Sequence, residues 1–237
     1  MTIYLPQLTA DPSWFPPVSE ALPNPDGLLA LGGDLSVLRL QHAYRQGIFP
    51  WFSAGDPMLW WSPAIRAVFA PGTLKVNRSL RKYQQQQKFT FSCNQAFAEV
   101  VKHCAAPRRH QPSTWIVPAI AKAYLQLHHA GQAHSIEVWH GSQLVGGLYG
   151  ITVGGLFCGE SMFNLRPNTA KLALVMLQQH LSAYAAGWID CQMPNPFLLQ
   201  QGACPMPRAD YLQLLTSLQA ADCPASHWQP GALELSL

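Results

Sequence analysis

The pattern of apolar and polar positions divides the chain into two parts. Residues 1–35 are rich in proline and glycine, which favour loops and short turns over long elements. A short helix is predicted next, because Ser36 can cap its start, apolar residues recur on one face, and Gly47 can end it. Aromatic residues then gather in the stretch 49–61. We expect residues 1–66 to form a small N-terminal domain.

Residues 67–237 predict one mixed domain. Three of its expected helices follow an asparagine that can cap them, and they span 77–87, 94–105 and 168–187. Two more begin at a proline, which suits the first turn, and they span 118–130 and 207–218. Apolar and alternating runs predict strands at 67–71, 88–92, 134–140, 143–153, 155–163 and 188–193. The paired glycines at 154–155 lie between two such runs, as in a hairpin. The expected fold class is therefore α+β, with a mostly antiparallel sheet flanked by helices.

Composition narrows the class of protein. Hydrophobic residues make up 49% of the chain and charged residues 11%, a balance that favours a folded core over disorder. No apolar run approaches the ~18 residues of a membrane span. The first residues lack the basic start and apolar run of a signal peptide, so we expect a cytoplasmic protein. The six cysteines are scattered without a CxxC pair, which favours reduced thiols.

Positive charge is concentrated in one third of the chain. Residues 57–135 contain ten lysines and arginines against one acid, Glu99, although the whole chain has a net charge of only +3. Lys and Arg hold proteins on nucleic acid by contacting phosphates, so this segment favours an RNA or DNA partner over an ordinary solvated face. The cations expected to bind phosphate are Lys75, Arg78, Arg81, Lys82, Arg108 and Arg109.

Asp190 is conspicuous because it lies in an apolar run. On a strand over 188–193, Asp190 and Gln192 would point to one face and Cys191 to the other. A buried carboxylate needs a partner, and the side-chain amide of Gln192 would be the nearest donor. The carboxylate would then aim the amide oxygen outward, where it could accept a hydrogen bond from an incoming amine. A purely structural Asp190 explains the pattern equally well.

Glu160 is a second acid among apolar neighbours, near the expected end of a strand. A lone carboxylate there could hold a cationic side chain, for which bidentate pairing with arginine is the strongest form. A strand end that merely faces solvent is the alternative.

Other chemistries find no support in the motifs. The sequence has no GxxxxGK[ST] or GxGxxG phosphate loop and no GxSxG elbow. Its cysteines and histidines form no four-ligand set, so we expect neither metal nor cofactor. Cys191 paired with a distant histidine stays open as a nucleophile, although its expected direction argues against it. The tryptophans could stack on bases, although core or interface positions are more usual.

Several sequence blocks resemble the signature blocks of bacterial leucyl/phenylalanyl-tRNA–protein transferases. In chain order they are GLLALGGDLS (27–36), AYRQGIFPWF (43–52), WWSPAIRAV (60–68), TWI (114–116), HSIEVW (134–139), LFCGESMF (156–163), NTAKLAL (168–174) and DCQ (190–192). The resemblance implies a C-terminal domain, residues 67–237, similar to the GNAT acyltransferases. It also implies a monomeric enzyme that moves leucine or phenylalanine, and methionine less well, from tRNA to proteins that begin with Arg or Lys, marking them for N-end rule degradation.

The resemblance also assigns roles to single residues. Asp190 and Gln192 match the family's catalytic pair, and Glu160 matches the carboxylate of its GES block. The residues matching its site for the tRNA end and the aminoacyl group are Tyr44, Trp51, Trp115, Tyr124, Leu148, Phe157 and Met162. The positions that depart from the family pattern are Ser113, Leu148, Thr169, Phe197 and Pro205. None of these departures touches the two acids or Gln192.

Two alternatives remain from the sequence. One is a related enzyme, either an acyltransferase that uses acyl-CoA or a transferase that adds amino acids to cell-wall precursors. The absence of a glycine-rich pyrophosphate loop weakens the CoA version. The other is a non-enzymatic RNA-binding module, in which Asp190 and Gln192 would be structural.

Overall fold

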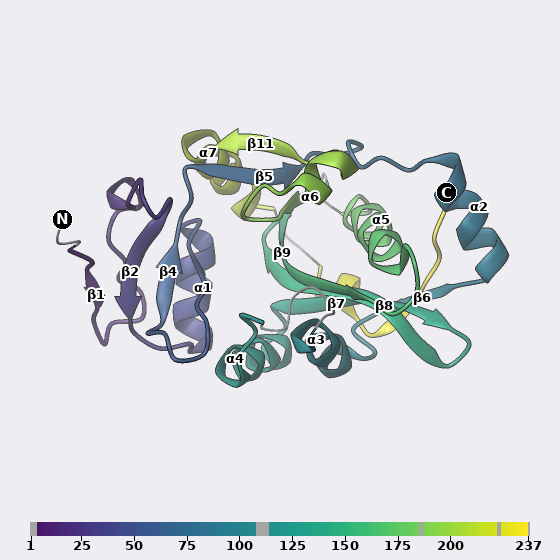
Figure 1. Ribbon diagram of the computed structural model, residues 1–237, viewed down its shortest axis with the longest axis horizontal. Helices are drawn as coiled ribbons and strands as arrows, with labels where there is room; N and C mark the ends of the chain where they lie inside the picture. Colours follow the sequence, from purple (N-terminus) through teal and green to yellow (C-terminus); the bar gives the residue numbers. More distant parts are fainter. Residues whose placement is uncertain (1–3, 108–113, 185–186, 222–223, 237) are drawn as a thin grey trace.

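Two separate sheets organise the chain in the computed structural model, which describes residues 4–107, 114–184, 187–221 and 224–236 (Figure 1). The small sheet has the order β1-β2-β4-β3, and α1 packs beside it. The elements of this N-terminal part are β1 (Gln7–Leu8), the 3-10 turn at Val18–Glu20, β2 (Leu28–Gly32), α1 (Val37–Arg45), β3 (Phe49–Pro50) and β4 (Leu59–Trp61).

The large sheet has eight strands in the order β11-β5-β10-β9-β8-β7-β6-β12. These are β11 (Cys204–Pro207), β5 (Ile65–Phe69), β10 (Trp188–Asp190), β9 (Leu156–Asn164), β8 (Gln143–Val153), β7 (Ala133–His140), β6 (Thr90–Cys93) and β12 (Gly231–Leu233). Neighbours run antiparallel except for β10 and β9, which are parallel and lie near the centre. A parallel pair needs a crossover connection, and α5 supplies it. The expected α+β class and mostly antiparallel sheet are thus confirmed.

Helices cover both faces of this sheet. Helix α5 lies on one face, and α3, α4 and α7 pack on the other (Figure 1). The helices of this part are α2 (Arg78–Gln87), α3 (Phe97–Ala105), α4 (Pro118–His129), α5 (Thr169–Leu181), α6 (Pro196–Gln201), α7 (Arg208–Gln219) and the 3-10 turn at Ala225–Trp228. The core of the small domain is continuous with the apolar layer beneath α3 and α4. This packing brings Tyr44 of α1 against Tyr124 of α4.

Helix starts agree with the sequence where a side chain caps the backbone. Ser36 accepts a hydrogen bond from the main-chain N–H of Arg39, and Asn77 accepts one from Leu80. Asn94 was expected to cap a helix, and that prediction is wrong. Its amide instead ties β6 to β7 and to the C-terminal segment, and α3 begins at Phe97.

Two other differences concern strands. The proline-rich N-terminal segment, expected to be loops, contains β1 and β2, and the edge strands β11 and β12 were not expected. All of them are short and pair with distant partners, so local pattern does not reveal them. The division at residue 66 stays a prediction; the sheets themselves change over between Trp61 and Ile65.

A β-bulge interrupts the pairing of β8 with β9. Tyr149 pairs with Ser161 and the next residue, Gly150, pairs with Gly159, so Glu160 is an extra residue without a ladder partner. The bulge shifts the alternation of side chains, and a shift of this kind re-aims a side chain. Phe157 and Met162, five residues apart, therefore face the same layer around α5.

Gly150 makes this bulge possible, so we predict that Gly150→Ala destabilises the protein. A Cβ there would lie 2.2 Å from the carbonyl oxygen of Cys158 and 2.5 Å from the ring of Phe157. Overpacking of this kind costs about 1–3 kcal/mol, which lowers Tm by several degrees in a chain of this size. Thermal unfolding measures the effect.

Gly159 supplies the matched control, because it pairs with Gly150 and its Cβ would meet only ordinary contacts, the nearest at 3.7 Å. Gly159→Ala should leave Tm within about 2 °C of the wild type. Equal losses in the two variants would contradict the role given to Gly150.

Candidate active site

A cavity of about 230 Å³ opens at the centre of the large sheet, between α5, α6 and the β8–β9 pair. One part of its wall is apolar and consists of Leu148, Met162, Leu174, Leu177, Ile189 and Leu198. The other part is polar and includes Glu160, Ser161, Gln192 and Asn195. A chamber of this kind can hold an apolar side chain while polar groups meet the atoms beside it.

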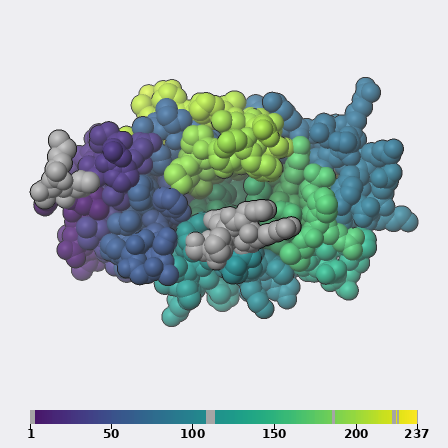
Figure 2. Space-filling model, in the orientation of Figure 1, coloured from purple at the N-terminus to yellow at the C-terminus, as the bar shows by residue number. Residues whose placement is uncertain are grey.

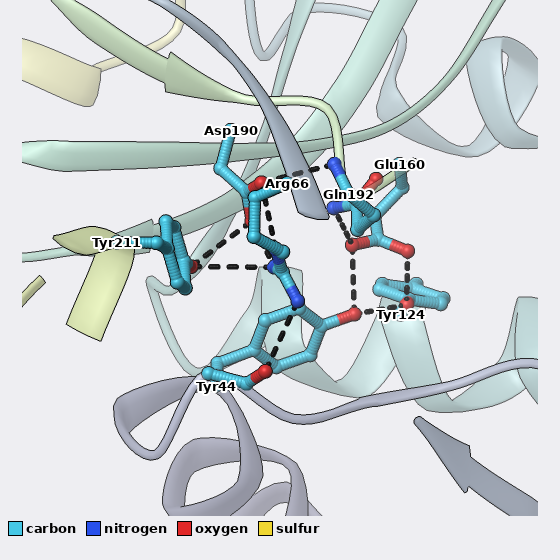
Figure 3. Close-up of polar contacts among 8 residues, drawn as sticks. Tyr44, Arg66, Tyr124, Glu160, Asp190, Gln192 and Tyr211 are labelled. Atoms are coloured by element: carbon cyan, nitrogen blue, oxygen red, sulfur yellow. Dashed lines mark hydrogen bonds and ion pairs between the residues drawn. The ribbon is translucent and has the colours of Figure 1, made fainter. Parts of the chain in front are cut away.

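Glu160 reaches the polar wall because it is the extra residue of the bulge. Its Oε1 lies 2.7 Å from the hydroxyl of Tyr44, and its Oε2 lies 2.6 Å from the hydroxyl of Tyr124 (Figure 3). The two hydroxyls are themselves 2.6 Å apart. Burial raises the pKa of Glu160 to about 7.

Gln192 stands beside Glu160 in a left-handed conformation, with φ at +57°. Its main-chain N–H donates to Oδ1 of Asp190 at 2.9 Å, and its carbonyl accepts from the N–H of Ala67. Its side-chain Nε2 lies 3.4 Å from Oε1 of Glu160. A left-handed residue other than glycine is held there by its surroundings, and such residues cluster at functional sites.

Asp190 is completely buried and forms a bidentate ion pair with Arg66. It also accepts a hydrogen bond from the hydroxyl of Tyr211 at 3.0 Å. The guanidinium of Arg66 also donates to the carbonyl of Gly47 and lies over the rings of Phe49 and Tyr211. Burial alone would lower the pKa of Arg66, but the adjacent carboxylate of Asp190 raises it above its usual value, so the guanidinium stays charged.

The expected arrangement of Asp190 and Gln192 is therefore wrong in its detail. Strand β10 ends at Asp190, so the alternation that would put both side chains on one face does not continue. Gln192 and Cys191 both line the cavity, whereas Asp190 lies behind the wall. Asp190 holds the backbone of Gln192, and Glu160 contacts its amide.

Cys191 is a poor nucleophile in this setting. Burial raises the pKa of its thiol, with the nearby carboxylate of Asp190 adding to the shift. The thiolate is the reactive form, and it is disfavoured here. The alternative of a cysteine nucleophile loses its support.

The expected aminoacyl-site residues divide into two groups. Leu148 and Met162 line the cavity, and Tyr44 and Tyr124 bind Glu160. Phe157 is fully buried in the core and is not part of the cavity wall.

The two tryptophans of that set lie elsewhere. Trp51 is 37% exposed and meets Trp61 edge to face. Trp115 packs at the border of the core that α3 and α4 cover. Neither lines the cavity.

The expected phosphate-binding cations are brought together only in part. Lys75, Arg78, Arg81 and Lys82 are exposed on α2 and just before it, and none pairs with a carboxylate among the described residues. Figure 2 shows this segment protruding at the end of the molecule opposite the N-terminus. Arg108 and Arg109 lie outside the described residues. Arg66, counted with the basic segment, is buried in its ion pair.

Sequence reasoning missed Arg66 and Tyr211 as parts of the site. A signal for Arg66 existed, because an arginine inside the apolar run IRAVF must find a partner if that run is buried. Tyr211 carried no such signal, since it fits the apolar face of its helix.

The described part of the chain contains no group of three or more His, Cys, Asp or Glu residues that could hold a metal ion. No helix within that part has the length and apolar character needed to cross a membrane.

Comparison with known proteins identifies a family for this chain. A family model described as leucyl/phenylalanyl-tRNA protein transferase matches residues 68–216, and the model of that family's N-terminal domain matches residues 33–64. A leucyl/phenylalanyl-tRNA–protein transferase of Shewanella piezotolerans is 53% identical over 98% of this chain and 99% of its own. One from Tolumonas auensis is 52% identical over 99% of this chain and 100% of its own.

Similarity to solved structures is weak. The C-terminal domain of a putative lysylphosphatidylglycerol synthetase from Agrobacterium fabrum is 11% identical, covers 86% of this chain and 64% of its own, and gives a TM-score of 0.38. A similarity of that strength carries no conclusion about the fold. The family models and the relatives that match nearly the whole chain support a conclusion about the family. The chain belongs to the leucyl/phenylalanyl-tRNA–protein transferase family and is an aminoacyltransferase.

Proposed function

We propose that this protein transfers leucine or phenylalanine, and methionine less well, from aminoacyl-tRNA to the N-terminal Arg or Lys of acceptor proteins. The product would carry a new N-terminal residue that marks it for N-end rule degradation. The reaction needs charged tRNA, so we propose that it takes place in the cytoplasm. We also propose that the active form is a monomer.

The observation that supports this proposal best is the two-sided wall of the cavity. Leu148, Met162 and their apolar neighbours offer a place for the transferred side chain, and Glu160 and Gln192 stand at the other side. An apolar pocket separates side chains that differ by one methylene by only ~1–3 kcal/mol, so selectivity among large apolar amino acids should be loose. A single carboxyl group at the polar side suits an acceptor that begins with a cation.

The protein has to position the two reactants more than it has to activate them. An aminoacyl ester is already reactive, and a neutral α-amine has only to be held against its carbonyl carbon, an arrangement that can supply much of the acceleration. Because Nε2 of Gln192 is directed at Glu160, the amide oxygen is left to accept a hydrogen bond from the amine. An amide is a poor base, so the proton of the amine passes on to the ribose oxygen or to water.

Asp190 enters this scheme as a positioning residue. It holds the main-chain N–H of Gln192 and is itself held by Arg66 and Tyr211. Its effect on transfer would therefore be exerted through the left-handed turn at Gln192.

We predict that the purified protein transfers leucine and phenylalanine from tRNA to a peptide that begins with Arg, without ATP or acyl-CoA. Methionine should transfer more slowly, and a peptide that begins with Gly should accept poorly because it offers no cation to Glu160. Radiolabelled aminoacyl-tRNA and peptide capture measure the product.

The same assay separates the alternatives. Acyl transfer that requires an acyl-CoA donor would contradict the proposal in favour of the CoA-dependent class. Binding of tRNA with no transfer to any peptide would support a non-enzymatic RNA-binding module.

The cations of α2 support a contact with tRNA phosphates. We predict that replacing Arg78, Arg81 and Lys82 by alanine weakens tRNA binding and flattens its salt dependence. Each lost phosphate contact should reduce the slope of log affinity against log salt by about 0.7–0.9, or by about 2–3 for all three. Filter binding or fluorescence anisotropy at several salt concentrations measures the slope.

Lys102 and Lys122 supply the matched control, since both are exposed cations of the same basic segment but lie on α3 and α4. Their double alanine variant should keep the wild-type slope. A triple α2 variant with an unchanged slope would remove that helix from the interface.

A further inference from the structure

Each short contact around Glu160 needs one proton, so the number of contacts can be compared with the number of protons available. Three groups, the carboxyl of Glu160 and the hydroxyls of Tyr44 and Tyr124, make three mutual contacts of 2.6–2.7 Å. A contact this short between two oxygens is favourable only with a proton between them. Burial raises the pKa of each tyrosine well above its usual value, so each hydroxyl owns one proton and no more.

An ionised Glu160 leaves this set one proton short. If both tyrosines donate to the carboxylate, the two hydroxyl oxygens face each other at 2.6 Å with no proton between them. If one tyrosine donates to the other, one contact with the carboxylate is left empty instead. A protonated Glu160 supplies the third proton and closes the ring.

The neighbouring amide fixes the direction of the ring. Nε2 of Gln192 points to Oε1 of Glu160, so Oε1 is the oxygen that only accepts. The proton therefore lies on Oε2, which donates to Tyr124. Tyr124 donates to Tyr44, and Tyr44 donates back to Oε1. Every donor and acceptor of the ring is then satisfied, as buried polar groups require.

We propose that Glu160 is an uncharged carboxylic acid in the free protein, closed into this ring with Tyr44 and Tyr124, and that a cationic acceptor side chain binds by displacing its proton. The second half rests on the proposed function, because it takes Glu160 as the group that meets the Arg or Lys of the acceptor. Binding of the cation and release of the proton balance in charge, so no further reactant is needed.

Other titratable groups near Glu160 do not supply the missing proton. Those that act on it or feel its charge, from the elements packed against it, are Arg66 of β5, Tyr149 of β8, Cys158 of β9 and Asp190 of β10. Arg66 and Asp190 neutralise each other as an ion pair. The thiol of Cys158 and the hydroxyl of Tyr149 keep their protons, because burial raises the pKa of both.

The exchange of a proton for a cation explains how the same acid can bind a cationic side chain and still be stable when the site is empty. An unpaired buried carboxylate is costly, whereas a neutral acid with all its hydrogen bonds is not. A bound cation reverses the balance, because an opposite charge within a few ångströms favours the ionised form. Affinity for a basic acceptor should then rise with pH up to about 7 and level off above it, where Glu160 has already lost its proton in the free protein.

The first experiment uses the free full-length protein, without tRNA or peptide. Infrared difference spectra over a pH titration should contain a carbonyl band of a protonated carboxylic acid that disappears with a midpoint near pH 7. The band should be missing in Glu160→Gln, a variant that keeps the ring because its amide can donate to Tyr124 and accept from Tyr44. This subtraction also removes any band from Glu137, the other buried glutamate with a raised pKa. A band that titrates at the ordinary carboxyl pKa would overturn the proposal.

Tyrosine variants test the proton count itself. Tyr44→Phe or Tyr124→Phe leaves two groups, the carboxyl and one hydroxyl, joined by a single contact. The proton of the remaining tyrosine fills that contact when Glu160 is ionised, so the midpoint should fall. Tyr149→Phe is the matched control: its buried hydroxyl makes no hydrogen bond within the described residues, and its ring lies 5.3 Å from that of Tyr124. If the tyrosines merely stabilised a carboxylate, removing either one would raise the midpoint. A raised or unchanged midpoint contradicts the ring.

Calorimetry tests the displacement. At pH 6, a peptide that begins with Arg should release about one proton more on binding than the same peptide beginning with citrulline, its uncharged analogue. Titrations in two buffers of different ionisation enthalpy give that number, and the citrulline peptide subtracts any proton lost by the α-amine. Glu160→Gln should abolish the difference.

The outcomes distinguish a failure of the displacement from a failure of the proposed function. No excess proton from a peptide that binds would refute the displacement while leaving the ring intact. An Arg peptide that does not bind, while the infrared midpoint stays near pH 7, would instead contradict the acceptor specificity in the proposed function. The displacement would then be withdrawn as well, and the ring would stand.

Discussion

The ion pair between Arg66 and Asp190 holds together the parts from which the site is made. Both side chains are almost completely buried, and their partners come from the small domain, from β5, from β10 and from α7. Removing one member of such a pair leaves a buried charge without a partner, which typically costs 3–5 kcal/mol. The pair also sets the position of Gln192, because the same carboxylate that binds Arg66 accepts the main-chain N–H two residues further on.

Two irregularities of the backbone bring the polar wall together, and the ion pair supports the second of them. The bulge in β9 turns Glu160 toward the cavity, and the left-handed turn after β10 turns Gln192 toward Glu160. Strands β9 and β10 are parallel neighbours, so both departures occur on adjacent strands. The small domain completes the arrangement by carrying Tyr44 to the carboxyl group. A reactive ester and an amine would thus meet a wall that the chain has fixed before they arrive.

Much of the fold follows from the sequence, and the reason is local. Ser36 and Asn77 begin helices through contacts within one turn, and the long, mainly apolar run of β8 predicts a strand by itself. The class of fold could be named from the sequence, and the resemblance pointed to Glu160 and Gln192 beside the cavity, but Arg66 and Tyr211 were missed. How these residues contact one another could not be predicted. The extra residue at Glu160 shows only when two strands are set in register, and Asp190 finds its partner 124 positions away.

The central claim is that the side chain of Asp190 is bound by Arg66 in a buried ion pair, and not by the side chain of Gln192. A double-mutant cycle on the free energy of unfolding, with Arg66→Met and Asp190→Asn, measures it most directly. Each single variant should be strongly destabilised, by roughly 3–5 kcal/mol for the loss of one charged partner. The double variant should lose much less than the sum, giving a coupling of about 2 kcal/mol or more. Additive losses would mean that the two side chains act independently, and would contradict the claim.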